Sequence, residues 1–142
     1  MERKTENMEK KTGETALAKL IANMEPVLNE GEYVFTTVKN INSIPREITI
    51  CEIKEKEGVT VILAKKEAEV LGLSFEYVAA WITLNIHSSL EAVGLTAAFA
   101  TELGKNNISC NVVAGYYHDH IFVDIKDKDK AVRVLKAMSE SK

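Results

Sequence analysis

The sequence has few aromatic residues and no strong excess of charge of either sign. Aromatic residues make up 6% of its 142 positions, and the net charge of −3 comes from acidic and basic residues that are interspersed. Surfaces that bind nucleic acids need a basic patch, and single-strand binding adds exposed aromatic rings. We therefore expect no nucleic-acid partner and no docking on an anionic membrane.

Long apolar runs are also missing. No run approaches the roughly 20 residues that a membrane-spanning helix needs. Residues 1–14 are charged throughout and lack the apolar core of a signal peptide. The sequence thus predicts a protein without a membrane partner, located in the cytoplasm.

Cysteine is scarce, with Cys51 and Cys110 as the two examples. They lie far apart, and each sits inside an apolar pattern typical of a strand. Two small buried side chains explain this placement better than a disulfide or a metal pair. We expect neither a metal site nor a bound cofactor.

What the chain does have is regular periodicity, with 46% apolar and 27% charged residues. After a charged tail over residues 1–13, the first half predicts a helix from Thr15 to Met24, closed by Pro26 and Gly31, then strands Tyr33–Val38, Glu47–Ile53 and Val59–Ala64, and a short helix Lys66–Leu71. The second half predicts strand Ala80–His87, a helix that ends at Lys105, strands Ser109–Gly115 and His120–Ile125, and a last helix capped by Asp127 or Asp129. The start of the long helix is open between Leu90, from the capping-box spacing Ser88-x-x-Glu91, and Val93.

Each half is close to one βαββαβ unit, so we expect an α+β fold of two ferredoxin-like units with helices packed on antiparallel sheets. The expected units are residues 14–78 and 79–142, divided near residues 75–80. The first half shows no obvious strand before its first helix. Its strand order therefore stays open, and strand Ala80–His87 can pair with strands of either half.

The stretch His87–Val123 resembles the ACT domain, the amino-acid-sensing module of aspartokinases and related regulators. It is most similar to small bacterial proteins with two tandem ACT-like units, largely of unassigned function. Val93-Gly94 stands where the wider family has Pro-Gly at the start of its first helix. Ile108–Val113 is similar to the second strand of the aspartokinase modules, where an Asn and backbone groups hold an amino acid across a subunit or domain interface.

The resemblance and the helix start together predict a regulatory module that binds an amino acid or related metabolite. A helix start offers backbone N–H groups and a dipole to a carboxylate, and a glycine allows close approach. The expected ligand-binding residues lie in the turn, the following strand and the hairpin: Ser88, Ser89, Val93, Gly94, Leu95, Thr96, Asn111, Val112, Val113, His118 and His120. A simpler interpretation stays open, in which the serines cap the helix and the glycine allows packing.

The histidines suggest two further chemistries, which we consider weaker. His118-Asp119-His120 sits at a hairpin turn and has no third metal ligand at a recognisable spacing. His87 and Ser88 are adjacent in a strand, so they point to opposite faces and make a poor base and nucleophile. We expect no catalytic residues and no enzyme activity. The alternatives are a ligand-free oligomerisation or interaction module, and a small enzyme that uses His87, His118 and His120. Because small sheets have open edges, we also expect a homodimer.

Overall fold

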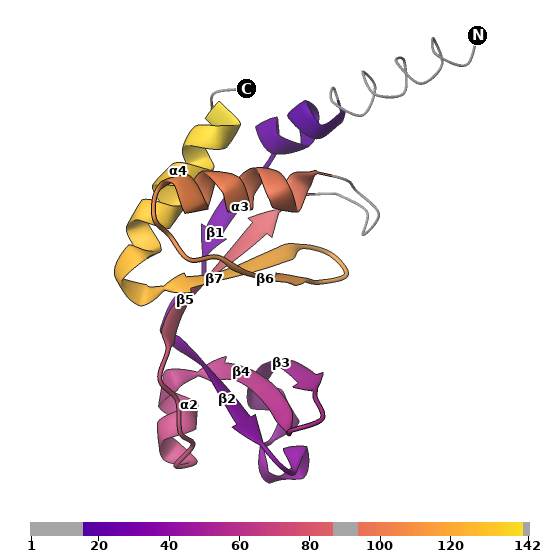
Figure 1. The fold of residues 1–142 in the computed structure, drawn as a ribbon, viewed down its shortest axis with the longest axis vertical. Helices are drawn as coiled ribbons and strands as arrows, with labels where there is room; N and C mark the ends of the chain where they lie inside the picture. Colours follow the sequence, from indigo (N-terminus) through magenta and orange to yellow (C-terminus); the bar gives the residue numbers. More distant parts are fainter. Residues whose placement is uncertain (1–15, 87–93, 141–142) are drawn as a thin grey trace, which may run out of the picture.

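The computed structural model describes residues 16–86 and 94–140, which form one antiparallel sheet and the helices that pack against it (Figure 1). A helix covers residues 16–22, and the strands are β1 (Glu25–Leu28), β2 (Tyr33–Val38), β3 (Thr49–Lys54), β4 (Val59–Ala64), β5 (Val78–Asn85), β6 (Asn111–Ala114) and β7 (Asp119–Asp124). The labelled helices are α2 (Lys65–Val70), α3 (Leu95–Lys105) and α4 (Lys128–Glu140), and 3-10 turns lie at η1 (Ile41–Ser43), η2 (Arg46–Ile48) and η3 (Ile125–Asp127).

The sheet contains two ferredoxin-like units that share strand β5. The strand order is β3-β4-β2-β5-β7-β6, and β1 also pairs with β5. The first unit uses the start of β5, where Val34 pairs with Val78 and Tyr33 with Ala79. The second unit uses the rest of β5, which pairs with β7 on one side and with β1 on the other. The α+β fold of two ferredoxin-like units is therefore confirmed.

Strand β1 was missed by the sequence prediction, which took Pro26 as the end of a helix. Proline is tolerated on an edge strand because its missing N–H can face away from the ladder. In the described ranges β1 pairs with β5 alone, with Pro26 opposite Leu84. Ile21 and Met24, just before β1, are buried in the core of the second unit. The unit boundaries near residue 78 stay a prediction, but residues 16–28 pack with the second half of the chain.

Several further elements begin at other residues than predicted, among them β6, at Asn111 rather than Ser109, and β7, at Asp119 rather than His120. Strand β3 begins at Thr49 rather than Glu47, because the chain after Pro45 first makes the turn η2. Strand β5 begins at Val78, two residues before the predicted Ala80. Before α4, the side chain of Asp124 accepts a hydrogen bond from the N–H of Lys126, which caps η3 and leads into the helix.

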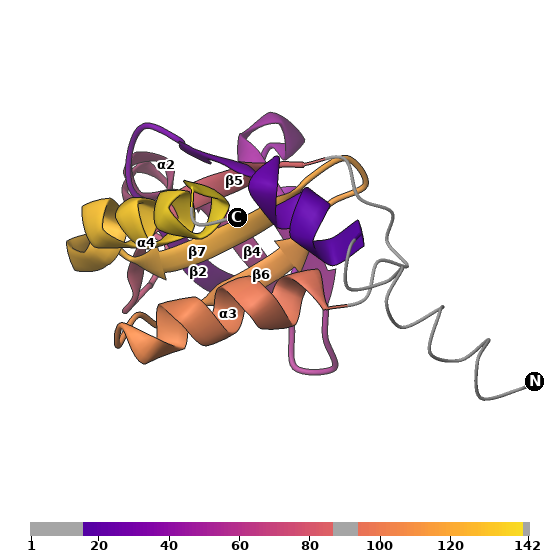
Figure 2. The same cartoon turned by 90° about the horizontal axis from the view of Figure 1, so that it is seen from above.

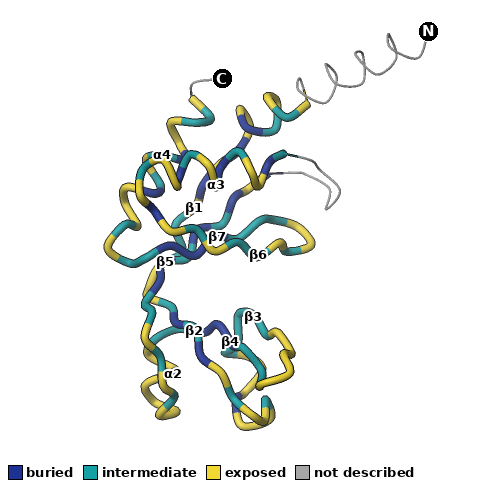
Figure 3. Tube along the Cα trace, in the orientation of Figure 1, coloured by how far each residue is buried: buried dark blue, intermediate teal, exposed yellow. Residues whose placement is uncertain are grey.

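Three apolar clusters occupy the two faces of the sheet. Helices α3 and α4 cover the second unit at one end of the molecule, and α2 covers the first unit at the other end (Figures 1 and 2). Along β5, Val78 joins the first helix-covered cluster and Ala80 the second, so both clusters lie on the same side of that strand. The opposite face carries the third cluster, built from both units around Ile62, Ala79 and Phe122. Burial is concentrated in the central strands, and the hairpin tips are exposed (Figure 3). No helix in the described ranges is long and apolar enough to cross a bilayer.

Candidate functional site

Among the predicted site residues, the start of α3 is the best-described candidate for binding an anion. Gly94 is the N-cap residue, with a left-handed φ of 93°. The first hydrogen bond of the helix runs from the N–H of Ala98 to the carbonyl of Gly94, at 2.9 Å. The N–H groups of the three preceding helical residues therefore have no partner within the helix, and the first turn has no acidic side chain. Leu95 is buried and Thr96 is exposed, so the outer side of this turn is accessible.

Leu17 lies directly beside Gly94, which the sequence did not predict. A Cβ at Gly94 would stand 3.1 Å from Cδ2 of Leu17. The helix over residues 16–22 thus forms one wall of the candidate site. Its apolar stripe was visible in the sequence, but a stripe does not show which partner it packs against.

Three of the expected ligand-binding residues lie outside the described residues: Ser88, Ser89 and Val93. His87, named in the enzyme alternative, also lies outside them. The structure does not test the capping box, but it begins α3 at Leu95, after the left-handed Gly94, and not at Leu90. Of the turn residues, it places Gly94, Leu95 and Thr96 together.

Within one chain, Asn111 lies away from the start of α3. Strands β5 and β6 run in the same direction, since both pair antiparallel with β7. Helix α3 runs back between them, so its start lies toward the hairpin end of β6, whereas Asn111 begins β6 at the other end (Figure 1). The side chain of Val112 joins the helix-covered core and Val113 joins the opposite face. The amide of Asn111 donates a hydrogen bond to the carbonyl of Phe122, at 3.4 Å.

The β6–β7 hairpin holds the two remaining histidines. The N–H of Gly115 donates to the carbonyl of His118 at 2.9 Å, which closes the turn. Tyr116 and Tyr117 form its tip, with 81% and 73% of their surfaces exposed. Within residues 16–86 and 94–140, no three His, Cys, Asp or Glu side chains lie close enough to hold a metal ion.

His120 is held in a hydrogen-bond network rather than presented to solvent. Its Nδ1 accepts a hydrogen bond from Nε1–H of Trp81, at 3.0 Å, and lies 3.2 Å from Oγ1 of Thr83. Burial lowers the pKa of His120, His118 acts in the same direction, and Asp119 opposes them. Burial also raises the pKa of the Asp119 carboxyl. A neutral, tethered imidazole fits a structural role better than acid–base catalysis.

Both cysteines lie in the described ranges and both are free, half-buried thiols. Burial raises the pKa of Cys51, and it raises the pKa of Cys110 to about 11. A nucleophilic cysteine needs a lowered pKa. These thiols therefore behave as small apolar side chains, and they pack with the apolar clusters.

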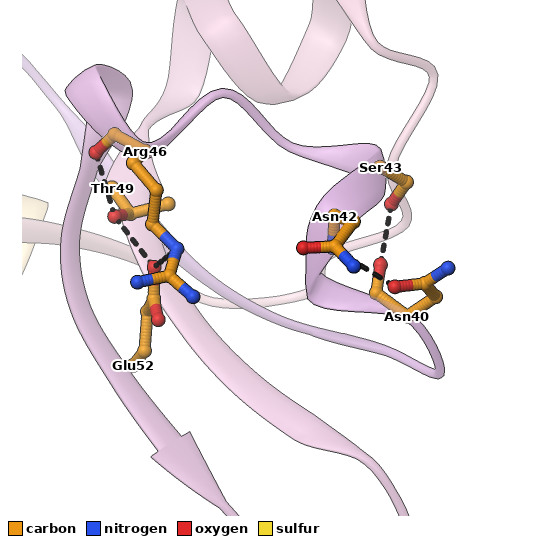
Figure 4. Close-up of polar contacts among 6 residues, drawn as sticks. All are labelled: Asn40, Asn42, Ser43, Arg46, Thr49 and Glu52. Carbon is orange, nitrogen blue, oxygen red and sulfur yellow. Dashed lines mark hydrogen bonds and ion pairs between the residues drawn. The ribbon is translucent and has the colours of Figure 1, made fainter.

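The first unit has no equivalent of the start of α3. Between β2 and β3, where the unit would carry its first helix, the chain makes the two short turns η1 and η2 (Figure 4). The polar groups here satisfy one another: Asn40 accepts a hydrogen bond from the N–H of Asn42, and Arg46 Nε lies 3.3 Å from Oε1 of Glu52. Oγ1 of Thr49 lies 3.0 Å both from that carboxylate oxygen and from the carbonyl of Arg46. In the described residues, therefore, the second unit carries a helix at this position and the first unit does not.

Paired ferredoxin-like units of this kind are the architecture of ACT domains. The chain matches the ACT domain over residues 12–80 and again over residues 76–137. The matches overlap at the beginning of β5, the strand that both units share. The chain belongs to the ACT-domain family.

Solved structures agree with this assignment. A Vibrio cholerae protein of unknown function, described as a possible transport protein, is 43% identical, with 89% of this chain and 98% of that chain covered and a TM-score of 0.81. The ligand-free regulatory subunit of aspartate kinase from Thermus thermophilus is 8% identical, with 80% and 95% covered and a TM-score of 0.57. Aspartokinase III of E. coli, in complex with aspartate and ADP, is 12% identical, with 80% and 32% covered and a TM-score of 0.58. At such identities the two kinases show the fold alone. No curated protein sequence matches significantly.

These comparisons bear on the class of function. ACT domains are regulatory rather than catalytic, in line with the expectation from the sequence. The chain is therefore a regulatory ligand-binding module.

Proposed function

We propose that this protein senses an amino acid or a related small metabolite, whose carboxylate binds at the start of α3. The observation that carries the proposal is the helix start itself. Gly94 supplies no capping side chain, and the first turn has no acidic residue to occupy the N–H groups. A carboxylate there gains both hydrogen bonds and the favourable end of the helix dipole.

The neighbouring groups suit the rest of such a ligand. The exposed hydroxyl of Thr96 can donate to or accept from a polar group, and Leu17 provides an apolar wall. Ser88, Ser89 and Val93 remain proposed site residues through their place in the turn.

In a homodimer, Asn111 of the second copy would lie near the candidate site of the first copy. In the described ranges β6 pairs with β7 alone, so its other edge is open to a second copy. Twofold pairing of the two β6 strands would be antiparallel, and it would carry the second copy's Asn111 toward the hairpin end of the first copy's β6. Asn111, Val112, Val113, His118 and His120 would then line a site between two chains. Sedimentation should show a dimer, and a 15.8 kDa monomer at high micromolar concentration would contradict this part of the proposal.

The proposed setting is the cytoplasm, with neither nucleic acid nor membrane as partner. The alternative is a ligand-free interaction module that uses the same sheet edge. The two differ in whether any small molecule stabilises the folded protein.

Thr96→Asp tests the ligand site directly. It places a carboxylate in the first turn, where it competes with a bound carboxylate while favouring the helix by about 0.3–1 kcal/mol. The matched control is Thr101→Asp, which makes the same change at an exposed position in the middle of α3. We expect a thermal-shift screen to find amino acids that raise the melting temperature of wild type and of Thr101→Asp, but not of Thr96→Asp. Equal shifts in all three proteins would move the site elsewhere. If no amino acid raises the melting temperature of any of the three proteins, the ligand-free interaction module becomes the better-supported function.

A further inference from the structure

The helix-free face of the sheet carries an aromatic cluster that joins the two units, here called the junction cluster. Its fully buried members are Ile62, Ala79 and Phe122, and its half-buried aromatic members are Tyr33, Phe35, Tyr77 and Trp81. Trp81 stands in the middle of it. Its ring stacks on Phe122 at a centroid distance of 6.1 Å and meets Tyr33 edge-on at 5.3 Å.

One polar contact fixes the orientation of Trp81. The indole Nε1–H donates a hydrogen bond to Nδ1 of His120, on the neighbouring strand β7, at 3.0 Å. An indole nitrogen is a donor and never an acceptor. Nδ1 of His120 must therefore carry no proton, which leaves the proton of the neutral imidazole on Nε2.

A second contact of Nδ1 is compatible with the same tautomer. The amide of Asn29 donates to Oγ1 of Thr83 at 2.9 Å, so the hydroxyl proton of Thr83 is free to point elsewhere. Oγ1 of Thr83 lies 3.2 Å from the same Nδ1 of His120. The chain Asn29–Thr83–His120–Trp81 thus links the segment between β1 and β2, strand β5 and strand β7, and it is consistent only when Nδ1 is an acceptor.

We propose that His120 is a proton-operated latch, which holds Trp81 in the junction cluster when neutral and releases it when Nδ1 becomes protonated. A proton on Nδ1 would face the indole N–H, so two donors would meet and the hydrogen bond would be lost. Trp81 would then keep its ring contacts without its polar anchor. The contact between the two units would loosen, together with the tie from Thr83 to β7.

The groups around His120 determine the pH at which its Nδ1 becomes protonated. From its own hairpin, His118 disfavours a second positive charge and Asp119 favours it. The neighbours on β5 and in the β1–β2 connection, Trp81, Thr83 and Asn29, are uncharged. Burial is the largest influence and lowers the pKa of His120 below its ordinary value of 6.5. The latch is therefore closed at neutral pH and opens in mild acid. His120 is also among the residues proposed to line the ligand site between two chains, but the latch uses contacts within one chain, and its test needs no ligand.

The chain contains a single tryptophan, so selectively excited tryptophan emission reports on the surroundings of Trp81. We expect wild-type emission to change in one single-proton transition with its midpoint below pH 6.5, while far-ultraviolet circular dichroism stays constant. His120→Gln replaces the imidazole by a group that can accept a hydrogen bond but does not titrate in this range, and it should lose the transition. The matched control is His118→Gln, the same change two residues away in the same hairpin, which should keep it.

Two outcomes would overturn the proposal. One is a flat emission curve for wild type between pH 8 and 4.5, and the other is an unchanged transition in His120→Gln. Nitrogen-15 NMR of the wild-type histidine rings gives an independent test if the variant does not fold. It should show His120 as the neutral Nε2–H tautomer at pH 8, and a protonated Nδ1 at that pH would refute the latch.

Discussion

The ring of Phe35, in the first unit, meets the ring of Phe122, in the second unit, edge-on, with centroids 5.5 Å apart and planes at 86°. Phe122 is 1% exposed, so Phe122→Ala should cost about 3–5 kcal/mol of stability through the cavity it leaves. Phe35 is half-buried, and Phe35→Ala should cost less. Urea unfolding of both single variants and the double variant should give a coupling of about 0.5–1.5 kcal/mol. Purely additive losses would show that the rings do not couple the units.

Gly94→Ala should destabilise the protein more than Gly72→Ala. Both glycines have a left-handed φ, at 93° and 66°, so both substitutions carry a backbone penalty of roughly 1 kcal/mol or more. A Cβ at Gly72 meets nothing within 4 Å, whereas one at Gly94 meets Leu17 at 3.1 Å. Thermal unfolding of the pair therefore isolates the contact with Leu17. Adding Leu17→Ala should recover part of the loss at Gly94 and none at Gly72.

Ile21→Ala should destabilise the second unit, although Ile21 lies within residues 14–78, the stretch expected to form the first unit. Ile21 is 5% exposed and lies in the core under α3 and α4. The expected loss is about 2–5 kcal/mol. Lys19→Ala, on the exposed side of the same helix, should stay within about 0.5 kcal/mol. Hydrogen exchange should show faster opening of β7 in Ile21→Ala, and faster exchange confined to β3 and β4 would contradict this packing.

The thiol of Cys110 should react slowly at neutral pH. With a pKa of about 11, only about one thiol in a thousand is ionised at pH 8. The pKa is raised in the folded state, so the unfolded chain loses this proton first. The protonated Cys110 thiol therefore makes its full contribution to stability below its pKa in the unfolded chain, about 9, and this contribution falls as the pH rises toward 11. Cys110→Ala should flatten this alkaline decline in melting temperature, and an unchanged decline would assign it to other groups.

Much of the fold could be predicted because its elements carry strong local patterns. Strand β4 has the predicted bounds Val59–Ala64, since it is an almost continuous apolar run between turn signals. Helix α3 ends at Lys105, as predicted. Strand β1 could not be predicted in the same way, because four residues that include Pro26 give no clear alternation, and its pairing with β5 is a contact across about 55 residues.

The candidate site was predictable only in its local part. Gly94 at a helix start is visible in the sequence, whereas the neighbour that covers it, Leu17, comes from a distant segment. The histidine triplet suggested ligand contacts, but the bond from Trp81 to His120 depends on the register of β5 against β7. Such a bond follows from tertiary pairing, which no short spacing encodes.

The eight-residue strand β5 has a consequence for how this chain can change. Because side chains alternate between faces, a one-residue shift within a strand exchanges its two sets of side chains. Inserting or deleting one residue between Val78 and Ile82 would move Val78 and Ala79 relative to β2, and at the same time move Ile82 relative to β1 and β7. Strand β5 therefore fixes the register of both ACT units. Length changes are expected to accumulate in the hairpins and connections and not in β5.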